Sequence, residues 1–252
     1  MSKLQLNEPN DYKAFPEEGT DTVVSQMPKL MTEGRTPLSM AGVMKARLNF
    51  RNSSSEDVRN SWLHNYFFTG DGIVYHPEGR VKIDLDSERL RKVTLQTRLC
   101  YRALPLQTGE YDSLQAPELS REEAESLMNG EWLKPKQVLD NRAWRIFARH
   151  PDEVPADMAE DVNLLREYNG LVSSESGSDR TMAIFKASSY DVPTMRSAVL
   201  GWFVNRSNAF GGDVFGYDDA RLVGVLAPYI GEKIKEDLTT LCEGDRSEGG
   251  RK

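Results

Sequence analysis

The chain has 252 residues, of which 38% are hydrophobic and 28% are charged, and its formal net charge is −7. A chain of this length can bury a sizeable core without disulfide bonds, and its composition excludes an intrinsically disordered protein. The acidic balance disfavours nonspecific binding to nucleic acid and to anionic membranes, because both require a broad positive field.

The cysteines and the apolar runs point to a protein in solution in a reducing compartment. The N-terminus lacks the apolar core of a signal peptide, and the longest near-apolar run, residues 198–204, is too short to span a bilayer. Cys100 and Cys242 stand apart in the sequence with no CxxC pair, which is typical of free thiols in the cytosol. We therefore expect a cytoplasmic protein that has no contact with a membrane.

The patterns divide the chain into four regions. Residues 1–35 have neither a helical nor a strand period and are predicted to be an extended N-terminal arm. Residues 36–117 are predicted to form a helix pair and an antiparallel sheet, and residues 118–241 a helical half that packs with them as one compact domain. The charged residues 242–252 are expected to be a disordered tail. The predicted fold class is therefore α+β, with a small antiparallel β-meander packed against a mostly α-helical C-terminal half.

The sheet is expected to begin after two helices, which apolar residues at helical spacing predict over residues 36–48 and 53–66. Apolar and polar residues then alternate over 73–85, around a turn that contains proline and glycine, which predicts a hairpin. Its buried side chains should be Val81, Ile83 and Leu85, with Lys82 and Asp84 exposed.

Further alternation predicts a long strand over residues 93–103 and a short return strand over residues 111–114. In the C-terminal half, helices are expected over residues 120–130, 135–150, 155–168, 191–204 and 218–241, and a strand over 182–185. The helix over 191–204 is apolar on almost every side, so we expect it to be the buried centre of this half, with Trp202 and Phe203 in the core.

Three arginines form the clearest candidate site. At helical spacing, Arg142, Arg145 and Arg149 fall in one stripe opposite the apolar side of their helix. Guanidinium groups bind phosphate and carboxylate in a defined orientation, so the stripe is predicted to bind an anion or a partner. The structural alternative is that carboxylates of the same chain neutralise it.

Other polar groups give weaker signals. His64, His76 and His150 match no metal-binding spacing, so no metal site is predicted from them, although a histidine beside a carboxylate can act as a general base. The glycine-rich stretch over residues 205–216 lacks a P-loop lysine. Its acidic residue, Asp213, and the two that follow at Asp218 and Asp219 would suit a Mg²⁺ ion or simply cap the next helix.

The leading functional hypothesis is a protein without enzymatic activity that binds another macromolecule, most simply a protein. The alternative is an enzyme that acts on a phosphorylated or other anionic substrate, with the arginine stripe as its clamp. No cofactor is indicated by the sequence. The two hypotheses differ in one spatial requirement, because an enzyme needs the arginines, a histidine and an acid to face one pocket.

Overall fold

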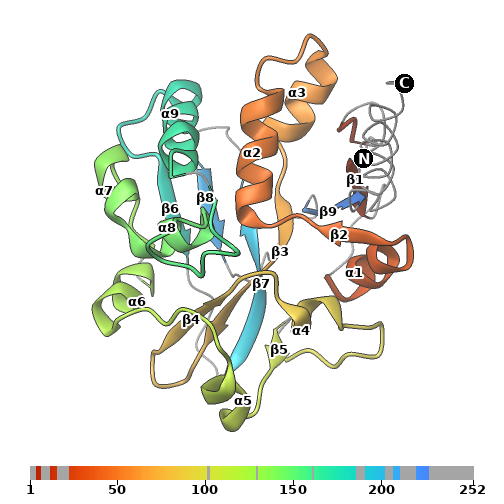
Figure 1. Ribbon diagram of the computed structural model, residues 1–252, viewed down its shortest axis with the longest axis vertical. Helices are drawn as coiled ribbons and strands as arrows, with labels where there is room; N and C mark the ends of the chain where they lie inside the picture. The colour runs from red at the N-terminus through yellow and green to blue at the C-terminus, as the bar shows by residue number, and fades with distance from the viewer. Residues whose placement is uncertain are drawn as a thin grey trace, which may run out of the picture.

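The computed structural model describes residues 4–6, 12–15, 23–100, 103–128, 130–160, 162–185, 191–201, 207–210 and 220–226. Nine strands in these residues form one sheet, whose main path runs β1-β9-β3-β7-β8-β6, while β2, β4 and β5 pair with β9, β3 and β7 (Figure 1). The strands are β1 (Tyr12–Phe15), β2 (Arg35–Pro37), β3 (Phe67–Tyr75), β4 (Val81–Asp84), β5 (Leu104–Pro105), β6 (Met182–Phe185), β7 (Thr194–Leu200), β8 (Ser207–Phe210) and β9 (Arg221–Leu226). The helices are α1 (Val23–Thr32), α2 (Met40–Phe50), α3 (Glu56–Leu63), α4 (Glu88–Arg91), α5 (Thr108–Ser113), α6 (Arg121–Met128), α7 (Pro135–Asp140), α8 (Arg142–Phe147) and α9 (Leu164–Ser176).

The predicted fold class, a small antiparallel meander packed against a mostly helical C-terminal half, is wrong. The sheet is large and mixed, because β3 pairs in parallel with β9, and β6 in parallel with β8. The strand predicted over 182–185 is present as β6, but β7, β8 and β9 also lie in the half that was expected to be mostly helical. The main error concerns the stretch that forms β7, every residue of which is buried, including the polar Thr194, Arg196 and Ser197. A strand covered on both faces need not alternate exposed polar with buried apolar residues, so its sequence does not distinguish it from a buried helix.

The central strand, β3, changes its partners along its length. Phe67 and Phe68 lie between β9 and β7, whereas residues 72–75 lie between β4 and β7. The register with β7 shifts between Phe68 and Gly72, which marks a β-bulge. The bulge interrupts the regular pairing at Asp71, so this residue can make contacts outside the sheet.

Apolar side chains cover both faces of the sheet. Ile73 and Tyr75 of β3 join the larger apolar cluster, and Val74 between them joins the smaller one, as the alternation of a strand requires. Helices α2, α6, α8 and α9 contribute to the larger cluster, and α1, α4 and α5 to the smaller one. The helix that carries the predicted arginine stripe therefore packs on the face of the larger cluster.

The predicted hairpin is confirmed as β3 and β4. Gly79 in its turn has a φ of +83°, a conformation that glycine adopts without strain, and the three apolar side chains expected in the core are buried. Of the two residues expected to be exposed, however, Lys82 is buried and Asp84 is half-buried. The Nζ of Lys82 donates hydrogen bonds to the backbone oxygens of Tyr111 and Leu114, at 3.0 and 2.9 Å. The length of the side chain lets the ammonium group reach these carbonyls across the apolar interior.

The other helices around the stripe differ from the prediction mainly in their limits. The helix expected over 135–150 is two helices, α7 and α8, because the side chain of Asn141 accepts the backbone N–H of Trp144 at 3.1 Å and caps a new helix. The capping box that begins α6 is confirmed, with Ser120 and Glu123 each accepting the other's backbone N–H. Residues 155–160 form turns and an irregular segment, and α9 begins only at Leu164.

The two strands predicted over 93–103 and 111–114 are absent from the described structure. Most of the first stretch is turn and irregular chain, in which the Thr97 hydroxyl accepts the backbone N–H of Thr94 at 2.8 Å. The second lies at the end of α5, a helix that is capped at its start, where Glu110 accepts the backbone N–H of Gln107 at 2.9 Å. Hydrogen bonds from side chains to nearby backbone thus replace the strand pairing that alternation alone suggested.

The described residues near the two ends of the chain belong to the sheet and its core. β1 pairs with β9, and Met27 and Leu30 of α1 are fully buried, so the region expected to be an extended arm contributes to the core. β8 occupies part of the predicted glycine-rich stretch, and β9 part of the predicted last helix. Trp202, Phe203, the three aspartates of the possible Mg²⁺ site and the tail lie outside the described residues.

Candidate functional site

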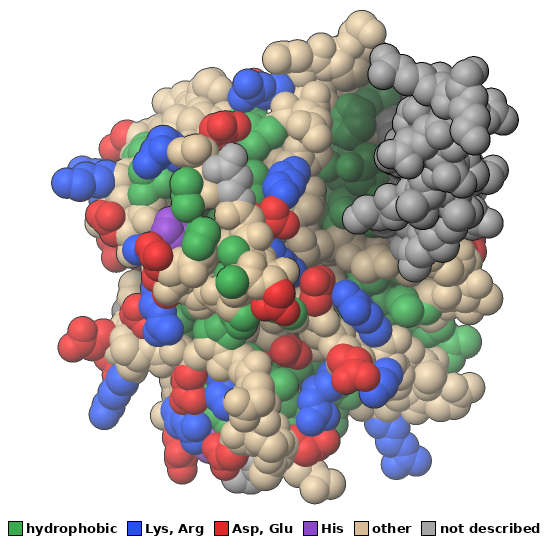
Figure 2. Space-filling model, in the orientation of Figure 1, with side chains coloured by type: hydrophobic (Ala, Val, Ile, Leu, Met, Phe, Trp, Pro, Cys, Tyr) green, Lys and Arg blue, Asp and Glu red, His purple; other side chains and the backbone are tan. Residues whose placement is uncertain are grey.

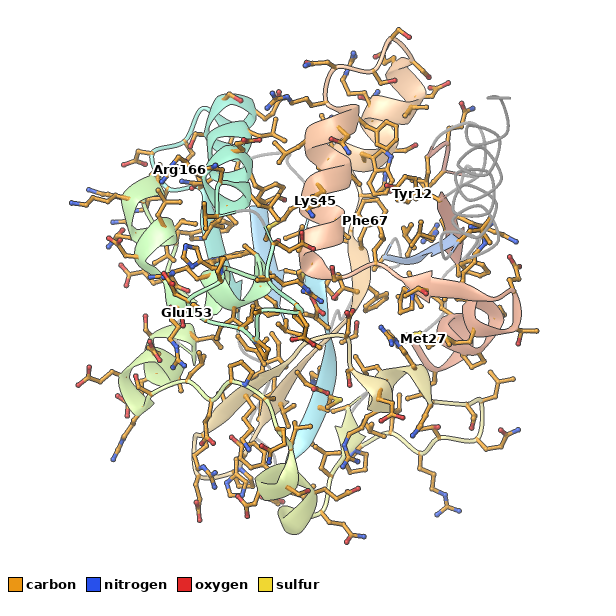
Figure 3. The ribbon with its side chains drawn as sticks, viewed as in Figure 1. Tyr12, Met27, Lys45, Phe67, Glu153 and Arg166 are labelled. Atoms are coloured by element: carbon orange, nitrogen blue, oxygen red, sulfur yellow. The ribbon has the colours of Figure 1, made fainter. Side chains whose placement is uncertain are left out.

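Arg142 opens α8 and is held by acceptors of the same chain. Its Nε donates to a carboxylate oxygen of Glu153 at 2.8 Å, and one terminal nitrogen donates to the backbone oxygen of Glu118 at 3.0 Å. The same nitrogen lies 3.4 Å from the carboxylate of Glu123 on α6. The hydrogen bond that Arg142 donates to Glu153 raises the pKa of Arg142, and this effect outweighs the opposite effect of burial. Glu153, labelled in Figure 3, follows α8 in the chain and thereby ties the start of this helix to its far end.

Arg145, one turn further along α8, shares this carboxylate. Its Nε lies 3.4 Å from the second oxygen of Glu153, and a terminal nitrogen lies 3.4 Å from Asp152. The same terminal nitrogen lies 3.3 Å from Nδ1 of His150. Both arginines of α8 are therefore bound to the loop that follows the helix.

Arg149 is buried in the interior beside the bulge of β3. Its two terminal nitrogens donate to the two carboxylate oxygens of Asp71, at 3.2 and 3.0 Å, and one of them lies 3.3 Å from Asp86. Asp71 is fully buried and also accepts the backbone N–H groups of Met40 and Asp86, at 2.7 and 2.9 Å. We call this set of residues the Asp71 cluster.

The Asp71 cluster joins four segments of the chain, namely the start of α2, the bulge of β3, the turn after β4 and the end of α8. Burial is the largest single influence on the pKa of Arg149 and lowers it, but the charges of Asp71 and Asp86 and the hydrogen bonds to them together raise the pKa above its ordinary value. Among the described non-glycine residues, only Asp86 and Arg149 have positive φ, at 48° and 56°. The ion pairs hold both residues in a backbone conformation that is uncommon for such side chains.

The positions of the three arginines match the structural alternative for the stripe. Each lies within ion-pair distance of a carboxylate of the same chain, and the side chain of Arg149 is only 4% exposed. Arg142 and Arg145 keep part of their surface, so a partner contact at these two residues stays a prediction.

The histidines do not assemble a metal site in the described part of the chain, where no group of three potential metal-binding side chains occurs. His76 lies in the hairpin turn, with its ring 4.8 Å from that of Tyr111, and His150 lies in the loop after α8 beside Asp152. His76 and His150 thus have separate local partners.

A groove lies next to Arg142, between α6, α8 and β6. Its apolar side chains are Leu127, Leu133, Ala143 and Ile184, and its polar ones are Glu123, Ser126, Glu131, Asn141 and Arg142. The groove forms because α6 packs beside β6, and because residue 133 pairs with β6 through hydrogen bonds of 2.8 and 2.9 Å. These contacts join distant segments, so no sequence motif could have indicated the groove.

The two glutamates of the groove differ in whether they already have hydrogen-bond or ion-pair partners within the chain. Glu123 accepts the capping hydrogen bond of α6 and contacts Arg142. Glu131 is exposed and has no cation within ion-pair distance among the described residues. Figure 2 shows acidic, basic and apolar side chains interleaved on the left side of the view, where Figure 1 places α6 to α9. The groove is therefore shallow, because Leu127, Ala143 and Ile184 of its lining are buried, and its exposed carboxylate is that of Glu131.

The comparisons with known proteins identify a fold. No protein-family model matches the chain, and no curated protein matches its sequence. None of the helices in the described segments is long and apolar enough to cross a bilayer. A solved structure described as "Accommodation of massive sequence variation in Nanoarchaeota by the C-type lectin fold" is similar with a TM-score of 0.56 and 14% identity, covering 88% of this chain and 100% of that chain. At this identity the likeness concerns the fold alone, and the mixed sheet with its flanking helices is similar to a C-type lectin fold.

Proposed function

We propose that the chain is a binding protein in which a body similar to the C-type lectin fold carries a contact surface for a protein partner. The observation that supports the proposal most directly is the groove beside Arg142, where buried apolar side chains adjoin the exposed carboxylate of Glu131, which has no cation within ion-pair distance in the described part of the chain. Protein interfaces typically combine apolar contact area with a small number of polar groups that select the partner.

The Asp71 cluster supports the first half of the proposal, a rigid body. It connects four segments through a carboxylate that is fully buried, and none of its bonds depends on the residues that line the groove. The similar solved structure is described as accommodating massive sequence variation. A core that is held from within would permit such variation at the surface of this chain too.

The arginine contacts weigh against the enzyme alternative in its original form. That hypothesis needed the three guanidinium groups to converge on one anionic substrate. Arg149 is instead buried against Asp71, and Arg142 and Arg145 are bonded to carboxylates that follow or flank α8. A substrate would have to displace these carboxylates from the arginines.

The proposal is tested by partner capture with groove variants. Ser126→Arg and Glu131→Lys change exposed residues at the groove, and Glu122→Lys makes the same charge change elsewhere on α6. In affinity purification from the native cell with mass spectrometry, the wild-type chain and Glu122→Lys should recover the same partner, and both groove variants should lose it. A partner set that is unchanged in Ser126→Arg would contradict the proposal.

A further inference from the structure

The turn that follows α8 is short, acidic and anchored at both ends. The backbone N–H of Glu153 donates to the carbonyl oxygen of His150 at 2.9 Å and closes the turn. The residues on either side of it, Arg149 and Val154, are buried. We call residues 150–153 the acidic turn. Because both flanking residues are held in the core, the turn can change its position without the unfolding of its neighbours.

The guanidinium group of Arg145 is held by the acidic turn alone among the described residues. Its Nε lies 3.4 Å from the carboxylate of Glu153, and one terminal nitrogen lies 3.4 Å from Asp152 and 3.3 Å from Nδ1 of His150. Arg142 depends on the turn only in part. Its Nε donates to Glu153 at 2.8 Å, whereas a terminal nitrogen contacts acceptors outside the turn. Displacement of the turn therefore frees Arg145 entirely and one donor of Arg142.

The acidic turn is an incomplete partner for Arg145. The Nε of Arg145 is buried and makes no hydrogen bond to the described residues, because its contact with Glu153 lacks hydrogen-bond geometry. The other two contacts of this guanidinium group are longer than the roughly 2.7–2.9 Å of charge-assisted hydrogen bonds. A buried donor without an acceptor is unfavourable. A carboxylate that approaches both guanidinium groups more closely can therefore replace the one that the turn supplies.

The two arginines lie where a partner at the groove meets them. Arg142 lines the groove together with Glu123, and Arg145 lies one turn further along α8. Their side chains keep 36% and 26% of their surface exposed beside the acidic turn. A segment that lies along the groove thus reaches guanidinium surface next to the carboxylate that already occupies it.

We propose that the acidic turn is an autoinhibitory contact, which an acidic segment of the protein partner displaces in order to bind Arg142 and Arg145 through its own carboxylate. The inference rests on the proposed function, because it gives the chemistry of the partner and the regulation of the site at the groove. Charge complementarity supports an acidic segment, since the free protein already holds a carboxylate between the same two guanidinium groups. Only molecules with a displaced turn bind, so the apparent affinity falls in proportion to their fraction.

Removal of the masking carboxylate gives the first test. The probe is a fluorescein-labelled hexaglutamate peptide, and its binding is measured by fluorescence anisotropy. Glu153→Gln should bind the peptide at least tenfold more tightly than the wild type. Asp157→Asn, which removes the same charge from an exposed residue of the same loop, should bind like the wild type. The further changes Arg142→Gln and Arg145→Gln should abolish the gain, and added salt should weaken binding.

Hydrogen exchange in the wild-type protein gives a second test that needs no substitution. With saturating hexaglutamate, exchange at the amide of Glu153 should accelerate because the turn opens. Exchange at the amide of Glu160, which donates to Arg149 at 2.7 Å, should not change. Equal affinities of the wild type and Glu153→Gln, a gain that survives the loss of both arginines, or a turn that stays protected with the peptide bound overturns the inference. If Ser126→Arg then still abolishes partner capture, the proposed function holds without it.

Discussion

Asp71 accepts hydrogen bonds from three separated parts of the chain. A substitution that exchanges one oxygen atom of its carboxylate for nitrogen therefore tests how much the whole cluster contributes to stability. Asp71→Asn keeps the shape of the side chain but removes the charge that offsets buried Arg149. Breaking a buried ion pair on one side costs about 3–5 kcal/mol. We expect this loss in the free energy of unfolding, measured by urea denaturation. Asp157→Asn, the same change at an exposed residue, should cost less than about 0.5 kcal/mol, and equal losses in the two variants would contradict the role of the cluster.

Replacing each of the three arginines should lower the free energy of unfolding, and the loss should be larger the more deeply the arginine is buried. Arg149→Gln leaves Asp71 without its partner in the interior and should cost about 3–5 kcal/mol. Arg142→Gln and Arg145→Gln remove partly exposed pairs and should cost about 1 kcal/mol or less each. Thermal or urea unfolding of the three single variants measures these losses. Equal losses in all three variants would contradict the assignment and would indicate one shared, exposed stripe.

Asp84, at the end of β4, is the residue for which pH and stability should be linked most clearly. Burial raises its pKa above the ordinary value, so the folded protein holds this proton more tightly than the unfolded chain. Its contribution is favourable at low pH and is lost as the pH rises through the folded pKa. Asp84→Asn should therefore raise the melting temperature at pH 7 and leave it unchanged below the ordinary pKa of the carboxyl group. If Asp84→Asn changed the melting temperature relative to the wild type by the same amount at both pH values, this assignment would be contradicted.

At the scale of elements, a hydrogen-bonded side chain connects α1 to β9. Fully buried Gln26 accepts the backbone N–H of Leu222 at 2.6 Å, and its Nε2 lies 3.4 Å from the backbone oxygen of Ala220. Gln26→Met keeps the volume but leaves a buried N–H without an acceptor, at a cost of about 1–3 kcal/mol. Hydrogen exchange at Leu222 should accelerate more than exchange in β4. Uniform acceleration throughout the sheet would mean only a general loss of stability.

Elements with local signals were predictable from the sequence, and elements defined by distant contacts were not. The hairpin of β3 and β4 has a turn and alternation within one short stretch, and α6 has a capping box formed by Ser120 and Glu123. β7 has no local signal that separates it from a buried helix, because its strand character comes from pairing with β3, β5 and β8. The alternation over 93–103 is a local pattern that gave a wrong prediction. Polar side chains in this stretch form hydrogen bonds to the backbone and stabilise turns in place of a strand.

The same distinction applies to the candidate site. Helical periodicity correctly grouped Arg142 and Arg145 on one helix, but it could not indicate that Glu153 returns to bind both. Arg149 lies beyond the end of α8 with positive φ, where helical spacing no longer applies. Its partner, Asp71, is 78 residues away in the sequence. The groove also requires β6 beside α6, which no pattern in either segment implies.

At the scale of the whole molecule, the N-terminal region should be essential to folding. Phe15, Met27 and Leu30 lie in the smaller core, and β1 pairs with β9 along four residues. Burying three such side chains contributes roughly 5–9 kcal/mol, which is comparable with the total stability of about 5–15 kcal/mol for a typical protein. A chain that begins at residue 36 should therefore lose its near-ultraviolet circular dichroism and its cooperative thermal transition. Adding a synthetic peptide of residues 1–35 should restore part of both signals, because the pairing with β9 needs no covalent connection. A shortened chain that melts cooperatively at the temperature of the full-length protein would show that the sheet and the larger core are sufficient without this region.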